Sequence, residues 1–430
     1  MSNILQTYQH YMGAISYAAF MLFVFLLPFP WDFSQPVLIV WLIAWALEFR
    51  WLKRPDLRDG VKPLVPLLLI AVLVAWEALS LLWAEDRLSG WHLVSRHLPL
   101  LALVVIGLFG VNEEYKPIRI KSALIAGCLI ATACYLMVVY WLQRMGKLDK
   151  LPGSWYWTML GSPHLLPLKH RFYYCLPMLL AIGFSADVFE YYRHRFSTLS
   201  AALTVGVADM ILVAAVFLTG SRTMMLLLPL LAVVMFFQHY RDRYRWAITA
   251  GVVALFAAFL FFGFRYQPRM REMRENVSSR LNNTDSQIKE PRTYIWRVIV
   301  KHPSDYGLLG MGAGSADAYL LRQYDAEMKT EKYYWELRDK RYGSHNQYLN
   351  VWMELGPLAL LLLLFLVVGS PFFLCGKVRQ DAVILCLLLG MGLLTETAAN
   401  RMSGIFILCT MLVLVIAEGC RTDSPPPAHR

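Results

Sequence analysis

One uncharged stretch, residues 122–142, decides the fold class. It reads SALIAGCLIATACYLMVVYWL, twenty-one residues without a charged side chain. A helix needs about 20 predominantly apolar residues to cross the hydrocarbon core of a bilayer. Over the whole chain, 57% of the residues are hydrophobic and 17% are charged. Soluble domains have roughly 45–50% apolar and about 25% charged residues. The composition argues against a soluble enzyme, a nucleic-acid-binding domain and a disordered protein, and predicts a polytopic membrane protein.

Similar stretches recur along the chain and predict about twelve transmembrane helices. Helices are expected because lipid offers no other partner to an open backbone. The expected spans are 13–29, 35–49, 63–83, 97–111, 119–141, 172–190, 198–219, 223–239, 246–264, 347–372, 381–396 and 402–418. This division places helices one to nine in residues 1–264, a long loop in 265–346 and helices ten to twelve in 347–418. Residues 419–430, which contain the Pro425–Pro427 run, are expected to form a disordered cytoplasmic tail.

The distribution of Lys and Arg over the short loops predicts the orientation. The loops at 50–62, 116–121, 193–195, 241–245 and 377–379 hold 15 of them, and those at 30–34, 84–96, 220–222 and 397–401 hold four. Short loops rich in Lys and Arg stay in the cytoplasm. Both termini are therefore expected in the cytoplasm, and residues 142–171 and 265–346 on the outer face.

The long outer loop is predicted to be mostly helical. Pro268 and Pro291 are each suited to the first turn of a helix, and the second of these helices is expected to end at His302, before Pro303. Ser315 is expected to cap a third helix. That helix would carry on one face Tyr319, Leu320, Tyr324 and Met328. Between the second and the third of these helices, an irregular turn is expected at Gly307, Gly310, Gly312 and Gly314.

Arginines at the outer face are the first candidates for a functional role. Arg222 lies in a turn of about three residues between two apolar spans. It is either an anchor to lipid headgroups or a fixed guanidinium for a lipid-linked anion, since its planar fork binds phosphate oxygens bidentately. Arg292 lies in the first turn of a predicted helix, where the backbone favours an anion, and shares a face with Trp296. An exposed helix charge is the alternative for Arg292.

His345 is the candidate catalytic residue. It lies in Gly343-Ser344-His345-Asn346-Gln347-Tyr348, where the long loop re-enters the membrane. Histidine can act as a general base near neutral pH, although a lone histidine is more often structural. Arg265 directly follows the ninth predicted span and is expected to be an interfacial anchor. His170 and Arg171 open the sixth predicted span and are either interfacial anchors or part of a lipid-phosphate groove.

Other kinds of site are poorly supported by the sequence. Intramembrane acids are few: Glu77 and Asp209 lie within spans and Glu396 at the end of one, which is little for a proton-coupled transporter. The outer loops lack a close carboxylate pair for a divalent metal. The glycine run at 310–314 lacks the spacing of a nucleotide-binding loop. No metal or cofactor is expected.

Several of these motifs together resemble bacterial O-antigen ligases and the related polymerases. The segment Ser344–Leu349, followed by Glu354, Leu355, Gly356 and Pro357, is similar to the H-N-x-Y-L…E-x-G signature of that family. Upstream, the series Arg292…Trp296…His302-Pro303…Gly310-Met311-Gly312 is similar to the family's R-x(3)-W…P…G-x-G stretch. The pair Ser221-Arg222 and the segment Ser80–Ala84 resemble two further recurrent pieces.

The resemblance implies a GT-C-like glycosyltransferase of the bacterial inner membrane with its active site on the periplasmic face. Such ligases transfer O-antigen glycan from undecaprenyl diphosphate to lipid A–core without a nucleotide sugar or an obligate metal. By position, His345 would be the catalytic histidine and Arg222, Arg292 and Arg265 would hold the donor diphosphate. A surrounding substrate groove would be formed by His170, Arg171, Asn346, Tyr348 and Trp296.

Two alternatives stay open at this point. An O-antigen polymerase uses the same donor and a lipid-linked glycan as acceptor. A transporter of lipid-linked glycan would also fit twelve spans, but it would call for a charged pathway inside the membrane, where acids are sparse. The sugars at either end of the reaction and the oligomeric state are not predicted.

Overall fold

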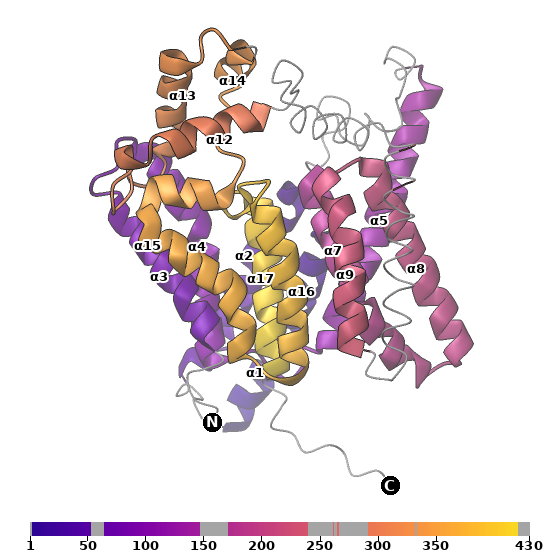
Figure 1. Cartoon of the computed structure of the whole chain (residues 1–430). Helices are drawn as coiled ribbons and strands as arrows, with labels where there is room; N and C mark the ends of the chain where they lie inside the picture. Colours follow the sequence, from indigo (N-terminus) through magenta and orange to yellow (C-terminus); the bar gives the residue numbers. More distant parts are fainter. Residues whose placement is uncertain are drawn as a thin grey trace.

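The computed structural model describes residues 2–52, 64–146, 171–239, 261, 265, 291–331 and 333–419. All regular structure within these residues is helical (Figure 1). The long helices are α1 (Ser2–Leu26), α2 (Trp31–Leu47), α3 (Val65–Ser80), α4 (Arg87–Phe109), α5 (Pro117–Arg144), α7 (Arg171–Arg193), α8 (Thr198–Thr219), α9 (Arg222–His239), α15 (Gln347–Gly369), α16 (Gly376–Leu393) and α17 (Met402–Gly419). The shorter elements are α12 (Pro291–Lys301), α13 (Ala316–Glu327), α14 (Tyr334–Asp339) and the 3-10 turns η1 (Arg50–Leu52), η4 (Pro303–Asp305), η5 (Ser370–Phe373) and η6 (Ala398–Asn400).

The chain is a polytopic membrane protein, and the part that the structure describes is all-helical. Within the described residues, six helices are long and apolar enough to cross a membrane, namely α1, α4, α5, α7, α8 and α15 with its continuation to Phe373. Shorter apolar helices are α2, α3, α9 and α17. The predicted span 246–264 and the helix predicted from Pro268 lie outside the described residues. The total of twelve spans therefore stays a prediction.

Two predicted spans need correction. The span expected at 97–111 begins earlier, as α4, because Asp86 caps it: its Oδ1 accepts from the backbone N–H of Ser89 at 3.0 Å. The first turns of α4 contain polar residues, so the hydropathy of the sequence did not indicate where this helix begins. The span expected at 347–372 is broken at Gly356, which has φ 81° and ψ 176°. The chain turns there, so residues 347–355 form a separate arm at one end of the apolar helix (Figure 1).

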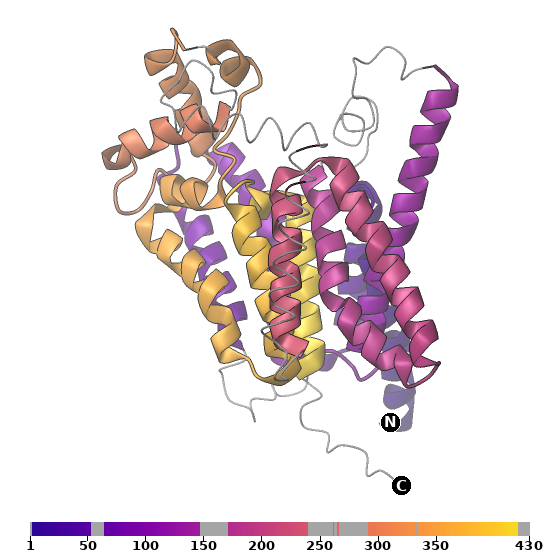
Figure 2. The ribbon, with the colours of Figure 1, turned by 45° about the vertical axis from the view of Figure 1, so that its right-hand side comes forward.

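Helix α7 lies at the centre of the bundle. Of its apolar window, 78% is buried, against 22–33% for the other five long spans. It packs against α5, α8, α9 and α16, and Figure 2 shows α5 and α8 on the side of the molecule away from α15. The exposed apolar face of α8, with Leu199, Leu203 and Met210, suits contact with lipid. Burial of α7 on all sides gives the outer helices a fixed support.

The helices of the long loop form a small unit with its own aromatic core. The core contains Tyr294, Ile295, Tyr306, Tyr319, Leu320, Tyr324 and Met328. This confirms the predicted buried face of the third helix, and α12 agrees with the helix predicted from Pro291. The unit sits over one end of the bundle, above α3, α4 and the arm of α15 (Figures 1 and 2). We call this end the site end.

The predicted glycine turn fastens this unit to the bundle. Gly310, Gly312 and Gly314 all have positive φ. The amides of Met311 and Gly312 donate to the carbonyls of Met353 and Glu354 at 2.9 and 2.8 Å. The indole Nε1 of Trp83 donates to the Gly310 carbonyl at 3.1 Å, and the amide of Ala313 donates to the Ser80 hydroxyl at 2.9 Å. The recurrent Ser80–Ala84 segment is thus a docking surface for the turn.

Ser315 does not cap α13 as predicted. It occupies the position before the helix, but its hydroxyl accepts from the amide of Glu85 at 3.3 Å. The buried carboxylate of Glu354 takes the capping role and accepts from the amide of Ala316 at 3.3 Å. Glu354 therefore joins the arm of α15 to the start of α13.

Candidate functional site

His345 stands at the junction of the loop unit and the membrane bundle. Its φ of 47° lies in the left-handed region, which costs a non-glycine residue roughly 1–2 kcal/mol. The turn is held from both sides. The indole Nε1 of Trp296 donates to the carbonyl of Ser344 at 2.9 Å, and the side chain of Asn346 caps α15 by accepting from two backbone amides. Strained residues that are held in place in this way concentrate at functional sites.

Glu396 connects His345 to Arg292. One carboxylate oxygen accepts from Nη2 of Arg292 at 2.9 Å, and the other lies 3.5 Å from Nδ1 of His345. The Glu396 side chain is 12% exposed, whereas those of His345 and Arg292 are 25% and 30% exposed. The carboxylate is therefore more buried than the imidazole and the guanidinium that it contacts, and these two groups stay accessible to a ligand. Sequence reasoning noted Glu396 only as an acid at the end of a span, because its partners are more than fifty residues away.

Further charges surround His345, Glu396 and Arg292, which are called the trio below. Arg401 and His345 both interact electrostatically with Asp317 at the start of α13. Arg401 and Glu396 both act on Tyr173 of α7, which is buried. The site thus draws on the loop unit, on α7 and on residues 394–401, which join α16 to α17 and are called the 394–401 segment below.

Arg222 begins α9 at the same end of the bundle. Its neighbour Thr223 donates from Oγ1 to the Oγ1 of Thr395 at 3.1 Å, and Thr395 directly precedes Glu396. The structure therefore brings the backbone of Arg222 close to the Glu396 trio, and the Arg222 side chain is half-buried.

The other predicted site residues have different surroundings. Arg171 begins α7 and acts electrostatically on Tyr135 and Cys175, toward α5. The hydroxyl of Tyr348 donates to the Gly390 carbonyl at 2.9 Å, inside the bundle. Arg265 has helical backbone geometry, and His170 lies outside the residues that the structure describes. The proposed binding roles of these four residues, and of Trp296 and Asn346, remain predictions.

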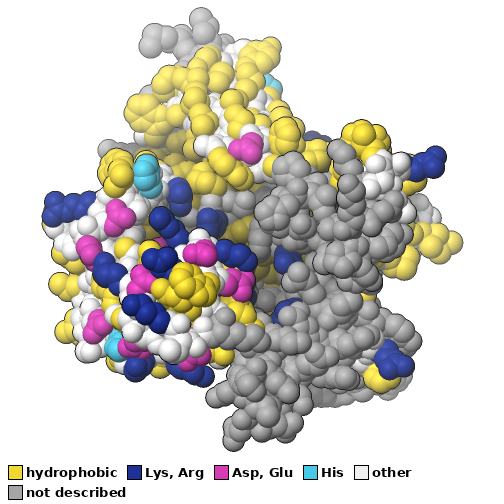
Figure 3. All heavy atoms as spheres, turned by 90° about the horizontal axis from the view of Figure 1, so that it is seen from above, with side chains coloured by type: hydrophobic (Ala, Val, Ile, Leu, Met, Phe, Trp, Pro, Cys, Tyr) yellow, Lys and Arg dark blue, Asp and Glu magenta, His cyan; other side chains and the backbone are white. Residues whose placement is uncertain are grey.

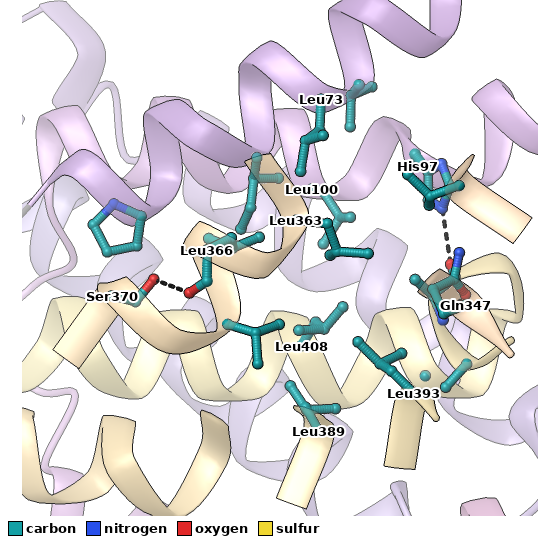
Figure 4. Close-up of a pocket in the computed structure, with 18 of the residues that line it drawn as sticks. Leu73, His97, Leu100, Gln347, Leu363, Leu366, Ser370, Leu389, Leu393 and Leu408 are labelled. Atoms are coloured by element: carbon teal, nitrogen blue, oxygen red, sulfur yellow. Dashed lines mark hydrogen bonds between the residues drawn. The ribbon is translucent and has the colours of Figure 1, made fainter. Parts of the chain in front are cut away.

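A second polar cluster lies just below the trio. His97 of α4 bonds to Glu77 of α3 through Nδ1 at 2.6 Å and to the carbonyl of Ala399 through Nε2 at 2.8 Å. Gln347 accepts from the amide of Ala399 at 3.1 Å and donates to Oδ1 of Asn400 at 2.7 Å. These residues form the polar end of a cavity of about 170 Å³. Its other walls are aliphatic, with Leu363, Leu366, Leu389, Leu393 and Leu408 among them (Figure 4).

The surface around the site is charged with both signs. Seen from the site end, Lys, Arg, Asp and Glu side chains are interspersed over the part of the surface that carries the loop unit (Figure 3). Two ion pairs of this region are Arg322 with Glu85 and Arg338 with Asp325. Glu327 at the end of α13 bonds to Lys301 and His302, and chiefly the hydrogen bond from Lys301 lowers the pKa of Glu327.

The arrangement at Glu396 suits acid–base chemistry on an anionic substrate. A carboxylate facing Nδ1 holds an imidazole with its Nε2 lone pair available, so Nε2 can accept a proton. Arg292 uses one N–H on Glu396, and its remaining N–H groups can bind phosphate oxygens. An imidazole, a carboxylate that faces it and a guanidinium are thus within one cluster.

A comparison with known families gives one match. The family model described as O-antigen ligase matches residues 207–364. This range begins in α8 and includes Arg222, Arg292 and His345 but ends before Glu396. None of the curated proteins matches the chain.

Proposed function

We propose that this chain, whose residues 207–364 match the O-antigen ligase family model, is an O-antigen ligase. It would transfer O-antigen glycan from undecaprenyl diphosphate to a sugar hydroxyl of lipid A–core. The observation that carries this proposal is the His345–Glu396–Arg292 trio, which lies at one end of a bundle of apolar helices. The chemistry of the trio matches what such a transfer requires.

The leaving group needs positive charge and the acceptor needs a base. The hydroxyl oxygen attacks the anomeric carbon as the bond from that carbon to the diphosphate oxygen breaks, and the electron pair leaves on the diphosphate. Guanidinium groups stabilise the charge that develops there, and Arg292 and Arg222 are the proposed donors, with Arg265 as a third. His345 Nε2 takes the proton of the hydroxyl. Attack opposite to the leaving group would invert the anomeric configuration.

Glu396 has two roles in this proposal. Its Oε2 orients the His345 ring through Nδ1 and stabilises the imidazolium that forms on proton transfer. Its Oε1 holds the Arg292 guanidinium beside the base. One carboxylate would thereby fix the distance between the proton acceptor and the diphosphate site, which is the kind of positioning that lowers the entropic part of a barrier.

The surroundings support a membrane-lipid substrate. The aliphatic cavity below the polar cluster suits part of a hydrocarbon chain. Of the loops rich in Lys and Arg, 116–121 and 193–195 lie at the end opposite the site, since α5 begins and α7 ends there (Figure 1). By the positive-inside rule this opposite end is cytoplasmic. The site would then face the periplasm of a bacterial inner membrane, in a GT-C-like enzyme of about twelve spans.

The test is reconstitution of the purified protein in liposomes with undecaprenyl-diphosphate-linked glycan and lipid A–core, without nucleotide or added metal. Glycan that appears on lipid A–core supports the ligase. Longer glycan that remains on the carrier would instead make the protein a polymerase. Folded protein that moves glycan to neither acceptor would refute both and favour a transporter.

A further inference from the structure

The 394–401 segment carries two charged residues of the site but is held by side chains that lie outside it. Its 3-10 turn η6 makes four hydrogen bonds with side chains of α4 and α15. His97 Nε2 donates to the carbonyl of Ala399 at 2.8 Å, and Arg96 Nη1 to the carbonyl of Asn400 at 3.4 Å. The two others involve Gln347, which donates to the side-chain oxygen of Asn400 and accepts from the backbone N–H of Ala399. Glu396 and Arg401 flank this turn, so its position sets theirs.

The two contacts of His97 assign its protons. A carbonyl oxygen only accepts, so Nε2 carries a hydrogen toward Ala399. Nδ1 lies 2.6 Å from a carboxyl oxygen of Glu77. One proton is therefore shared between that nitrogen and that oxygen, on either atom. His97 and Glu77 are 7% and 5% exposed, so water does not compete for these bonds. The ring is fixed at both nitrogens, and its Nε2–H is aimed at the turn.

Gln347 links the two halves of the site. It lies two residues after His345 and is 3% exposed. The backbone N–H of Ala399 must donate, so the side-chain oxygen of Gln347 faces Ala399 and its amide nitrogen faces Asn400. The first turn of α15 is thereby tied to η6. This tie connects His345, which lies just before α15, to the segment that carries Glu396.

We propose that Glu77, His97 and Gln347 are positioning residues that set the separation of His345 and Glu396. The inference rests on the proposed function and adds to it three residues that lie on α3, α4 and α15. Apolar side chains of similar shape would hold these helices together at least as well, because burial of polar groups is costly. Apolar packing has no directional bonds, whereas this network holds the backbone carbonyl and the backbone N–H of Ala399 in fixed positions, in the turn beside Glu396.

Two substitutions of His97 test this directly. Glutamine places its amide nitrogen near the position of Nε2 and keeps the bond to Ala399, whereas asparagine places it near Nδ1 and keeps only the bond to Glu77. We expect His97→Gln to retain most of the transfer activity. His97→Asn should lower kcat at least about tenfold, with a smaller change in KM for the donor, because a misplacement on the order of 1 Å costs about 10²-fold.

A second pair covers the case in which the His97 variants do not fold. Gln347→Met removes both bonds at nearly constant shape, and Gln347→Glu keeps the bond from Ala399 while Asn400 can turn its amide to donate. The proposal predicts a lower kcat for Gln347→Met than for Gln347→Glu. The matched control is Thr410→Val, since Thr410 is buried and its hydroxyl bonds only within its own helix, to the Phe406 carbonyl.

Hydrogen exchange gives a readout that does not depend on turnover. Backbone amides of the 394–401 segment should exchange faster in His97→Asn than in His97→Gln, and amides of α7 should not change. Equal kcat and equal exchange in the two His97 variants, beside an active wild-type protein, would overturn the inference. A wild-type protein without any transfer would instead count against the proposed function, while the exchange comparison would still test the positioning.

Discussion

The substitution Glu396→Gln tests the role of the carboxylate that joins base and guanidinium. The amide keeps the size of the side chain and can still accept from Arg292, but it has no charge to stabilise an imidazolium on His345. At 3.5 Å, a unit charge pair is worth about 5 kcal/mol at an effective dielectric constant of about 20. His345 is 25% exposed and Arg292 neutralises part of the carboxylate, so we expect about half of that value.

A loss of about 2.5 kcal/mol in transition-state stabilisation lowers kcat on the order of 10²-fold. The assay is transfer from the lipid-diphosphate donor in liposomes, at several donor concentrations, so that kcat and KM are separated. The matched control is Glu327→Gln. That glutamate also contacts one histidine and one cation, His302 and Lys301, but lies outside the trio. Wild-type kcat in Glu396→Gln, or an equal loss in Glu327→Gln, would refute the reasoning.

Three further predictions follow from the same geometry. His345→Gly and His345→Ala should both abolish transfer, but the glycine variant should unfold at the higher temperature in detergent. The reason is that the left-handed φ of 47° costs alanine roughly 1 kcal/mol more than glycine. Equal melting temperatures would show that the backbone is unstrained. Gly312→Ala should separate the loop unit from the bundle and lower transfer, because the new Cβ would lie 2.4 Å from the Cα of Ala84. Gly307→Ala is also at positive φ, but its Cβ would have nothing within 4 Å, so this variant should transfer normally. Similar losses in both variants would attribute the effect to φ alone. Arg292→Lys should raise KM for the donor roughly tenfold, because a point charge replaces a bidentate fork; an unchanged KM would separate Arg292 from diphosphate binding.

Much of the architecture could be predicted because lipid imposes a simple rule on the sequence. Residues that face lipid must be apolar over the length of a span, so hydropathy located α5, α7 and α8 within a few residues. It failed where a helix starts in polar residues, as α4 does, and where a glycine breaks an apolar run, as Gly356 does in α15. The first feature is a side-chain cap by Asp86 and the second is the backbone conformation of Gly356. Hydropathy reports neither.

The site was only half predictable for a related reason. Arg222, Arg292 and His345 stood out because each lies beside a turn or at a helix start where a charge has no obvious solvating role. Glu396, Glu77 and His97 did not stand out, because each is a single polar residue in or next to an apolar run. Their significance comes from pairing across helices, and those pairs are separated by twenty to more than three hundred residues. One partial signal was available, since an acid buried in a membrane helix calls for a partner.

The central claim is that His345 acts as the base at a site that binds a lipid diphosphate independently of it. The most direct measurement follows donor binding and glycan transfer in the same liposomes for wild-type protein and His345→Ala. The account predicts that the variant binds undecaprenyl-diphosphate-linked glycan as the wild type does and transfers none of it to lipid A–core. Transfer by the folded variant at the wild-type rate would contradict the account.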